Sequence, residues 1–137
     1  MFLYDFTIVE APIDLVAERL RRDATGILRE AAARAGGNEP APPEVGEVRP
    51  RADGWALSVH WDRSGWPAPF SRLDGELEIA PLLHGRTHLS VSASWDTAGT
   101  RTSSRGESLR ARHETETVVR EFLVAAADLL GLTHLVD

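Results

Sequence analysis

Residues 107–130, ESLRARHETETVVREFLVAAADLL, decide the fold of this chain. Apolar residues recur there at intervals of three and four, which is the spacing of one face of a helix. Glu116 and Arg120 stand four residues apart on the other side, where we expect an ion pair. Gly131 is a natural cap for the end of the helix. The apolar stripe consists of Ala111, Thr115, Val118, Phe122, Ala126 and Leu129, widened by Val119, Leu123 and Leu130.

Three segments upstream of this helix alternate between apolar and polar residues. Such alternation is typical of antiparallel strands with one buried face and one wet face. The predicted strands run from residue 55 to 61, from 73 to 80 and from 89 to 95. Their apolar faces carry Trp55, Leu57, Val59 and Trp61, then Leu73, Leu77 and Ile79, then Leu89, Val91, Ala93 and Trp95.

The first half of the chain supplies another strand and two short helices. Residues 2–9 alternate, and we assign Phe2, Tyr4, Phe6 and Ile8 to the buried face, leaving Leu3 and Val9 outside. Pro12 is suited to open a helix, and helical spacing continues to about Arg22. A second helix is predicted from about residue 24 to 35, ended by Gly36 and Gly37. Residues 45–48 form a short edge-like strand, and Asp53-Gly54 predicts a tight hairpin turn.

This order of elements predicts an α+β fold in one domain, residues 1–137. The strands bury only one face, and the C-terminal helix is the only predicted element long enough to cover that face. We therefore expect a curved antiparallel β-sheet wrapped around the long C-terminal helix. The two short helices after the first strand would close one end of the sheet.

The element order resembles the helix-grip fold of the START-like, plant-allergen and polyketide-cyclase superfamily (SRPBCC). Four stretches carry the resemblance, which extends over essentially the whole chain and is closest to short actinobacterial members. These are VEAP (9–12), PFSRLDGELEIAP (69–81), GRTHLSVS (85–92) and TVVREFL (117–123). The resemblance implies binding of lipids or other hydrophobic ligands, or polyketide cyclase and dehydrase chemistry. The chain is shorter than larger members, so we expect a minimal domain.

Composition excludes several kinds of chemistry. The 137 residues contain no Cys and no Lys, so disulfides, thiolate sites, Schiff bases and Walker lysines are excluded. A formal net charge of -6 disfavours nucleic acid and anionic membranes as partners. Arg19, Arg21 and Arg22 form the densest basic group, which we interpret as a solvated helix face.

The sequence predicts neither a signal peptide nor a membrane-spanning helix. It has no apolar run long enough to span a membrane, and its first residues lack the features of a signal peptide. We expect a cytoplasmic protein. No cofactor and no metal are expected.

The buried faces predict an apolar pocket between the sheet and the C-terminal helix. The alternative is that the same large side chains simply fill the core. Trp66 stands in a Gly- and Pro-containing loop, where it could act as a lid, contact a partner or fold back onto the sheet. The predicted lining residues are Tyr4, Trp55, Leu57, Trp61, Leu77, Leu89, Val91, Trp95, Thr115, Phe122 and Ala126.

Polar residues give little support for catalysis. His60 and His88 fall on wet sheet faces, where with Asp62 they could hold a metal if their strands were aligned; a solvated face is the alternative. Tyr4, Thr87 and Thr115 point inward in the predicted phase, and no inward carboxylate or histidine accompanies them. This absence argues against an enzyme, although a slip of one residue would exchange the two faces.

Three functions remain open from the sequence. The first is a binding domain for a hydrophobic or aromatic small molecule. The second is an aromatase/cyclase-like enzyme with Tyr4 as general acid. The third is an interaction module without a ligand, either monomeric or forming a homodimer.

Overall fold

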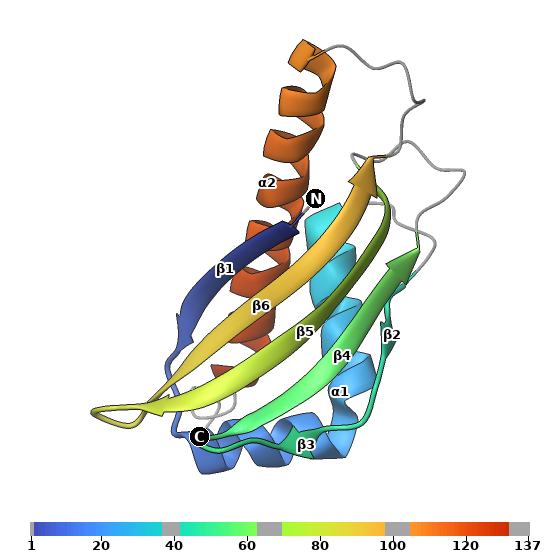
Figure 1. The fold of residues 1–137 in the computed structure, drawn as a ribbon. Helices are drawn as coiled ribbons and strands as arrows, with labels where there is room; N and C mark the ends of the chain where they lie inside the picture. Colours follow the sequence, from blue (N-terminus) through green and yellow to red (C-terminus); the bar gives the residue numbers. More distant parts are fainter. Residues whose placement is uncertain (1, 37–41, 63–69, 98–104, 132–137) are drawn as a thin grey trace.

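A computed structural model describes residues 2–36, 42–62, 70–97 and 105–131 (Figure 1). The strands pair throughout as antiparallel neighbours in one sheet, in the order β1-β6-β5-β4-β2, with β3 also paired to β4. Both helices lie against the same face of this curved sheet (Figure 1). The elements are β1 (Phe2–Val9), α1 (Ile13–Gly36), β2 (Glu44–Val45), β3 (Arg49–Pro50), β4 (Trp55–Asp62), β5 (Phe70–Leu82), β6 (Arg86–Thr97) and α2 (Arg105–Gly131).

The predicted α+β helix-grip fold is confirmed: a curved antiparallel sheet wraps around the long C-terminal helix α2. The helix packs against β1, β6 and α1. None of the helices in the described ranges is long and apolar enough to cross a membrane. The buried residues of α2 include Thr115, Val119, Phe122, Leu123, Ala125, Ala126, Ala127 and Leu130.

One predicted contact of α2 is wrong. Arg120 pairs with Asp5 of β1, its Nη1 lying 3.0 Å from the carboxylate oxygen Oδ1, and not with Glu116. The same nitrogen donates to the carbonyl oxygen of Phe6 at 2.5 Å. Glu116 instead faces Arg112 at 3.6 Å. Because β1 runs beside α2, the strand offers Arg120 both a carboxylate and a backbone carbonyl, which the neighbouring helical turn does not.

Helix α1 consists of the two predicted helical segments, joined at a kink. Asp23 has non-helical backbone angles, with φ of -154° and ψ of 53°. Its carboxylate oxygen Oδ1 accepts a hydrogen bond from the backbone amide of Gly26 at 3.1 Å. Asp23 therefore acts as the N-terminal cap of the second segment. Figure 1 shows that the first segment lies across one end of the sheet, whereas the second runs beside α2.

The inner face of the sheet is organised in rows of residues paired across neighbouring strands. Each row contains one residue from each strand that it crosses, because paired residues lie directly opposite one another in the register. Successive rows are Trp61–Leu73–Trp95, then Val59–Gly75–Ala93–Leu3, then Leu57–Leu77–Val91–Asp5, then Trp55–Ile79–Leu89–Thr7.

The predicted phase of β1 is wrong. Leu3 and Val9 are buried, with 6% and 0% of their surface exposed, whereas Tyr4 is 55% exposed on the outer face. Phe6 also lies outside, where its ring stacks on that of His88 at a centroid distance of 5.0 Å. Both faces of this strand carry apolar residues, so alternation alone could not choose between them. Contact with α2 selects the face with the more compact side chains.

The cap at Asp23 predicts a measurable loss of stability when it is removed. Asp23→Ala should lower the free energy of unfolding by about 1 kcal/mol, because the Gly26 amide loses its acceptor. Asp23→Ser, which keeps an acceptor, should retain most of the stability. Urea denaturation followed by circular dichroism measures both, and equal losses in the two variants would contradict the capping role.

Candidate functional site

Large aromatic side chains gather between the sheet and α2. Trp61 and Trp95 are buried on either side of Leu73 in one row of the inner face. Phe122 of α2 meets Trp61 directly, with ring centroids 5.6 Å apart and planes tilted by 51°. This row lies at the end of the sheet where β4 and β6 finish and α2 begins (Figure 1).

The hydroxyl of Thr115 is an unsatisfied polar group in this apolar interior. Thr115 lies seven residues before Phe122, about two turns nearer the start of α2. Its side chain is 0% exposed, and its Oγ1 atom has no hydrogen-bond partner among the described residues. Thr87 is buried equally deeply, but its Oγ1 donates to the carbonyl oxygen of Ala11 at 2.8 Å. Buried polar groups are normally paired, so Thr115 is available to a molecule that enters the interior.

The deeper part of the predicted pocket is occupied by side chains packed together. These residues belong to one continuous cluster that joins the sheet to both helices. They are Leu57, Leu77, Leu89, Val91 and Ala126, and the same cluster also contains Trp61, Trp95 and Phe122.

Three other predicted residues lie elsewhere. Trp55 is only partly buried, at the opposite end of β4 from Trp61, and the guanidinium of Arg21 lies 4.7 Å from its ring centroid. Tyr4 is on the outer side, which corrects its predicted place in the pocket, because the phase of β1 is reversed. Trp66, the predicted lid, lies outside the described residues.

Tyr4 lines a different hollow, of about 220 Å³, between β1 and α2. The hollow also contains the carboxylates of Asp5 and Glu116. Both carboxylates are already engaged, Asp5 by Arg120 and by the Phe6 amide, and Glu116 by Arg112. The phenol that the cyclase hypothesis required therefore stands at the edge of the sheet and not among the buried aromatic rings.

The histidines on the outer face do not come together. His60 on β4 and His88 on β6 are separated by β5, and their cross-strand partners on that strand are Asp74 and Ala80. The Nδ1 atom of His60 contacts the carboxylate of Asp74. Within the described ranges, no group of three or more His, Cys, Asp or Glu residues could hold a metal ion.

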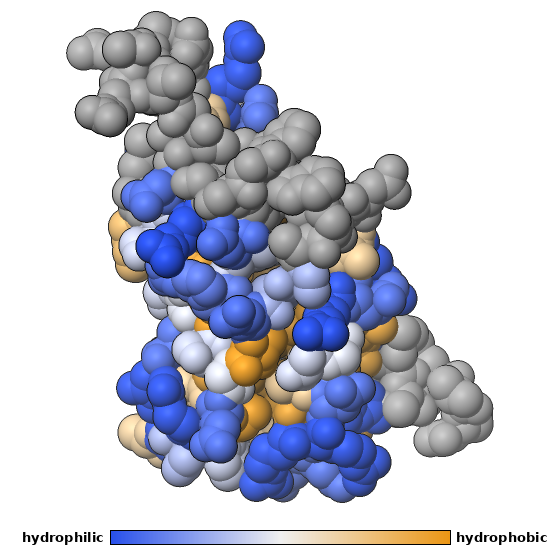
Figure 2. Space-filling model, turned by 90° about the vertical axis from the view of Figure 1, so that its right-hand side faces the viewer, coloured by the Kyte–Doolittle hydropathy of each residue, from blue (hydrophilic) through white to orange (hydrophobic). Residues whose placement is uncertain are grey.

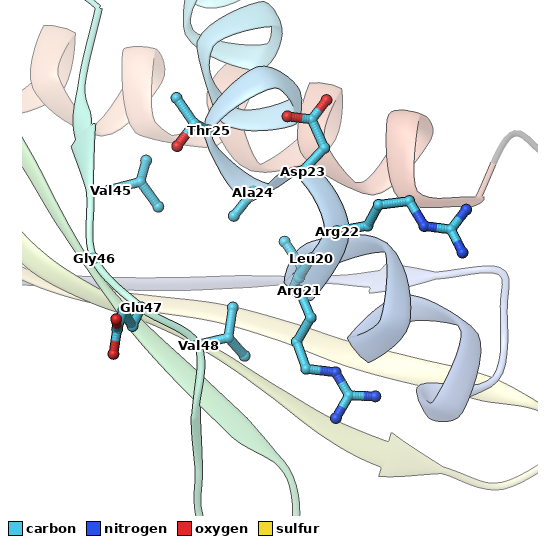
Figure 3. Close-up of a pocket in the computed structure, with 10 residues that line it drawn as sticks. All are labelled: Leu20, Arg21, Arg22, Asp23, Ala24, Thr25, Val45, Gly46, Glu47 and Val48. Atoms are coloured by element: carbon cyan, nitrogen blue, oxygen red, sulfur yellow. The ribbon is translucent and has the colours of Figure 1, made fainter.

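A third hollow, of about 550 Å³, was not predicted from the sequence (Figure 3). It separates residues 20–25 of α1 from residues 45–48 of the edge formed by β2 and β3. Arg19, Arg21 and Arg22 were predicted to form one solvated helix face, but each has a different role. Arg19 donates to the carbonyl of Leu130 at 2.8 Å, Arg22 pairs with Glu18 at 2.8 Å, and Arg21 lies over Trp55.

This groove could not be found from helix periodicity, because its two walls are far apart in the sequence. One available signal was Asp23, a favourable cap residue placed directly before the second helical segment. A kink at that position turns the chain away from the sheet edge. The other signal was the apolar pair Val45 and Val48 in an edge strand.

Comparisons with known proteins establish the fold alone. No family model matches the chain, and no curated protein matches it. Among solved structures, the di-domain ARO/CYC protein BexL from the BE-7585A biosynthetic pathway has a TM-score of 0.61 at 16% identity, over 93% of this chain and 45% of that one. The present chain thus spans under half of BexL.

Two further structures are similar over nearly the full length of both partners. A protein from Nitrosospira multiformis has a TM-score of 0.54 at 17% identity, with 100% of each chain covered. Ara h 8.0201 has a TM-score of 0.52 at 10% identity, over 95% of this chain and 97% of that one. These similarities show that the chain has the helix-grip fold.

The two buried threonines predict opposite responses to the same substitution. Thr115→Val should leave the ligand-free protein equally stable or raise the free energy of unfolding by about 1 kcal/mol, because an unpaired hydroxyl is replaced by a methyl group. Thr87→Val should lower it by about 1–3 kcal/mol, because the Ala11 carbonyl loses its donor. Chemical denaturation of both variants measures the contrast, and a larger loss at Thr115 would show that its hydroxyl is paired in solution.

Proposed function

We propose that this domain binds a small, mainly aromatic molecule between the sheet and α2, at the end marked by Trp61, Trp95 and Thr115. The observation that carries the proposal is the hydroxyl of Thr115, which is fully buried and has no hydrogen-bond partner in the described ranges. Small-molecule sites are typically apolar cavities with a few well-placed polar groups that orient the ligand. Thr115 supplies such a group, and the indole rings supply the apolar walls.

The chemistry of these walls indicates the class of ligand. Flat aromatic ligands can stack against indole rings or meet them edge to face. Burial of apolar surface contributes about 25 cal/mol per Å² before the costs of association are subtracted. The threonine hydroxyl can donate to a carbonyl oxygen or accept from a hydroxyl group. An aromatic ketone or phenol therefore satisfies both parts of the site.

The residues of the inner face favour a ligand-binding role over a catalytic one. BexL is described as an ARO/CYC protein, and its fold covers 93% of this chain at a TM-score of 0.61. A cyclase of this kind would need an acid or a base near the reacting carbonyl groups. Among the described residues of the inner strand faces, Asp5 is the ionisable one, and it is paired with Arg120 at the sheet edge. We therefore favour binding without catalysis.

Two matched ligands test the proposed contact with Thr115. 2-Acetylnaphthalene should bind more tightly than 2-ethylnaphthalene, because only the ketone can accept the hydrogen bond. Thr115→Val should lower the affinity for the ketone by about tenfold, which corresponds to the loss of one hydrogen bond. It should change the affinity for the hydrocarbon by less than about twofold. Calorimetric titration measures the affinities, and Trp fluorescence reports whether the buried rings are involved.

Thr87→Ser is the matched control, because it keeps the hydroxyl that donates to Ala11. It should change neither affinity. An equal effect of Thr115→Val on the two ligands would refute the hydrogen bond. Failure of both ligands to bind at millimolar concentration, with Trp fluorescence unchanged, would refute the binding site itself.

A second candidate function rests on the outer face of β1. Phe2, Tyr4, Phe6 and Ile8 are all exposed there, beside the serines of β6. This strip carries no formal charge, so two copies of a chain with net charge -6 could approach each other along it. The Phe6 amide and carbonyl are occupied by Asp5 and Arg120, which disfavours pairing through the strand edge. We propose a homodimer in which the outer faces of β1 from two copies of the chain pack against each other along this strip.

Sedimentation at several concentrations tests this candidate. If the strip associates, the apparent mass should rise from 15.0 kDa toward twice that value with concentration, and Phe6→Ser should abolish the rise. Leu109→Ser is the control, since Leu109 is an exposed apolar residue near the start of α2. A monomer at all concentrations would exclude the homodimer.

A further inference from the structure

The groove between α1 and the edge of the sheet has the form of a small-molecule site. Its volume of about 550 Å³ lies within the range of about 300–1,000 Å³ that is usual for ligand pockets. One wall is the kinked part of α1 and the other is the short link between β2 and β3 (Figure 3). The groove is separate from the interior site at Thr115, which lies on α2 and does not line it.

Two backbone features keep the groove open. The kink at Asp23 changes the direction of α1 and so prevents the helix from closing onto the edge strands. On the opposite wall, the Gly46 amide donates to the Ser58 carbonyl at 2.8 Å. A Cβ atom at Gly46 would stand within hard contact of the Ser58 hydroxyl, so glycine lets this link lie close to β4. The walls are thus fixed by backbone geometry.

The groove has an apolar floor. Leu20 is buried, and Ala24, Val45 and Val48 are partly buried against the core. Figure 2 shows the side of the molecule that holds α1 and β2, where hydrophobic surface lies between bands of hydrophilic surface. Leu20 and Val48 also border a narrow space, lined in addition by Trp55, that is too tight for water. An apolar group in the groove would therefore contact Leu20, Val45 and Val48.

Arg21 provides a cation on the wall of this groove. Its guanidinium lies over the Trp55 ring at 4.7 Å, a cation–π arrangement that restrains the side chain. Among the ion pairs formed by the described residues, none includes Arg21, whereas the neighbouring Arg22 is paired with Glu18. When a guanidinium stacks on an aromatic ring, its N–H groups still point outward in the guanidinium plane, where they can bind a planar anion.

The acidic residues that line the groove form no ion pair with Arg21 in the described structure. Asp23 is engaged as the cap of the second helical segment, through the Gly26 amide. Glu47 comes from the opposite wall, on the link between β2 and β3 (Figure 3). The groove thus combines the apolar side chains of its floor with one cation that has no carboxylate partner in the described structure.

We propose that this groove binds a small amphiphilic carboxylate, with its head group on Arg21 and its hydrocarbon part along Leu20, Val45 and Val48. A carboxylate can form two parallel hydrogen bonds with a guanidinium, which a hydroxyl or ester group cannot match. Contact of the hydrocarbon part with the floor adds the hydrophobic contribution. The site selects by charge at one end and by apolar surface at the other, and it is independent of the proposed interior site.

Octanoate and 1-octanol form the pair of probes that tests this site. Octanoate should bind more tightly than 1-octanol, and the amide resonances that shift in ¹⁵N NMR titrations should include Ala24, Thr25 and Gly46. Arg21→Gln should lower the affinity for octanoate by about tenfold and the affinity for 1-octanol by less than about twofold. Arg21→Lys keeps the positive charge and should restore part of the affinity.

Arg22→Gln is the matched control, because Arg22 is the adjacent arginine and is already paired with Glu18. It should leave octanoate binding within about twofold of the original protein. Equal binding of octanoate and 1-octanol by the original protein, or equal losses in the two glutamine variants, would overturn the proposal. Shifts confined to Thr115 and its neighbours would also overturn it, while supporting the interior site; Thr115→Val should not alter shifts at the groove.

Discussion

The packing of α2 against the concave face of the sheet is the constraint on which the remaining structure depends. The direct contact between Phe122 and Trp61 joins the middle of the helix to the end of β4. A sheet of this width is not covered by one helix, so the second segment of α1 packs beside α2. Leu28, Ala31 and Ala32 are completely or almost completely buried there. Two small alanines allow the helices to approach closely and complete the cover.

This arrangement gives the kink at Asp23 its importance. A straight α1 could either close the end of the sheet or run beside α2, but it could not do both. The capped kink lets the first segment do the former and the second segment the latter. The same change of direction leaves residues 20–25 separated from the β2–β3 edge, which creates the groove beside Arg21. The core and the groove therefore have one common origin.

Sequence patterns predicted the elements whose two faces differ clearly in polarity. In β4, β5 and β6, aromatic and aliphatic residues alternate with serine, histidine and carboxylates, so one phase was far more favourable than the other. In β1 both faces carry apolar residues, and contact with α2 decides which face is buried. The local sequence of β1 holds no information about this long-range contact. The partner of Arg120 was predicted within its own helix because its actual partner, Asp5, lies on a distant strand that local spacing does not reveal. The groove escaped prediction because Val45 and Val48 meet Leu20 only in the folded chain.

The distribution of polar groups between the two faces of the sheet bears on function. On the outer face, Glu76 pairs with Arg49 and Arg51, and Asp74 contacts His60. Such exposed pairs contribute little to stability, typically about 0–1 kcal/mol each, and they face solvent instead of an enclosed substrate. Opposite the inner face, α2 carries the Thr115 hydroxyl, which is buried and has no hydrogen-bond partner among the described residues. A hydroxyl in an apolar interior can orient a bound molecule, because it can both donate and accept a hydrogen bond.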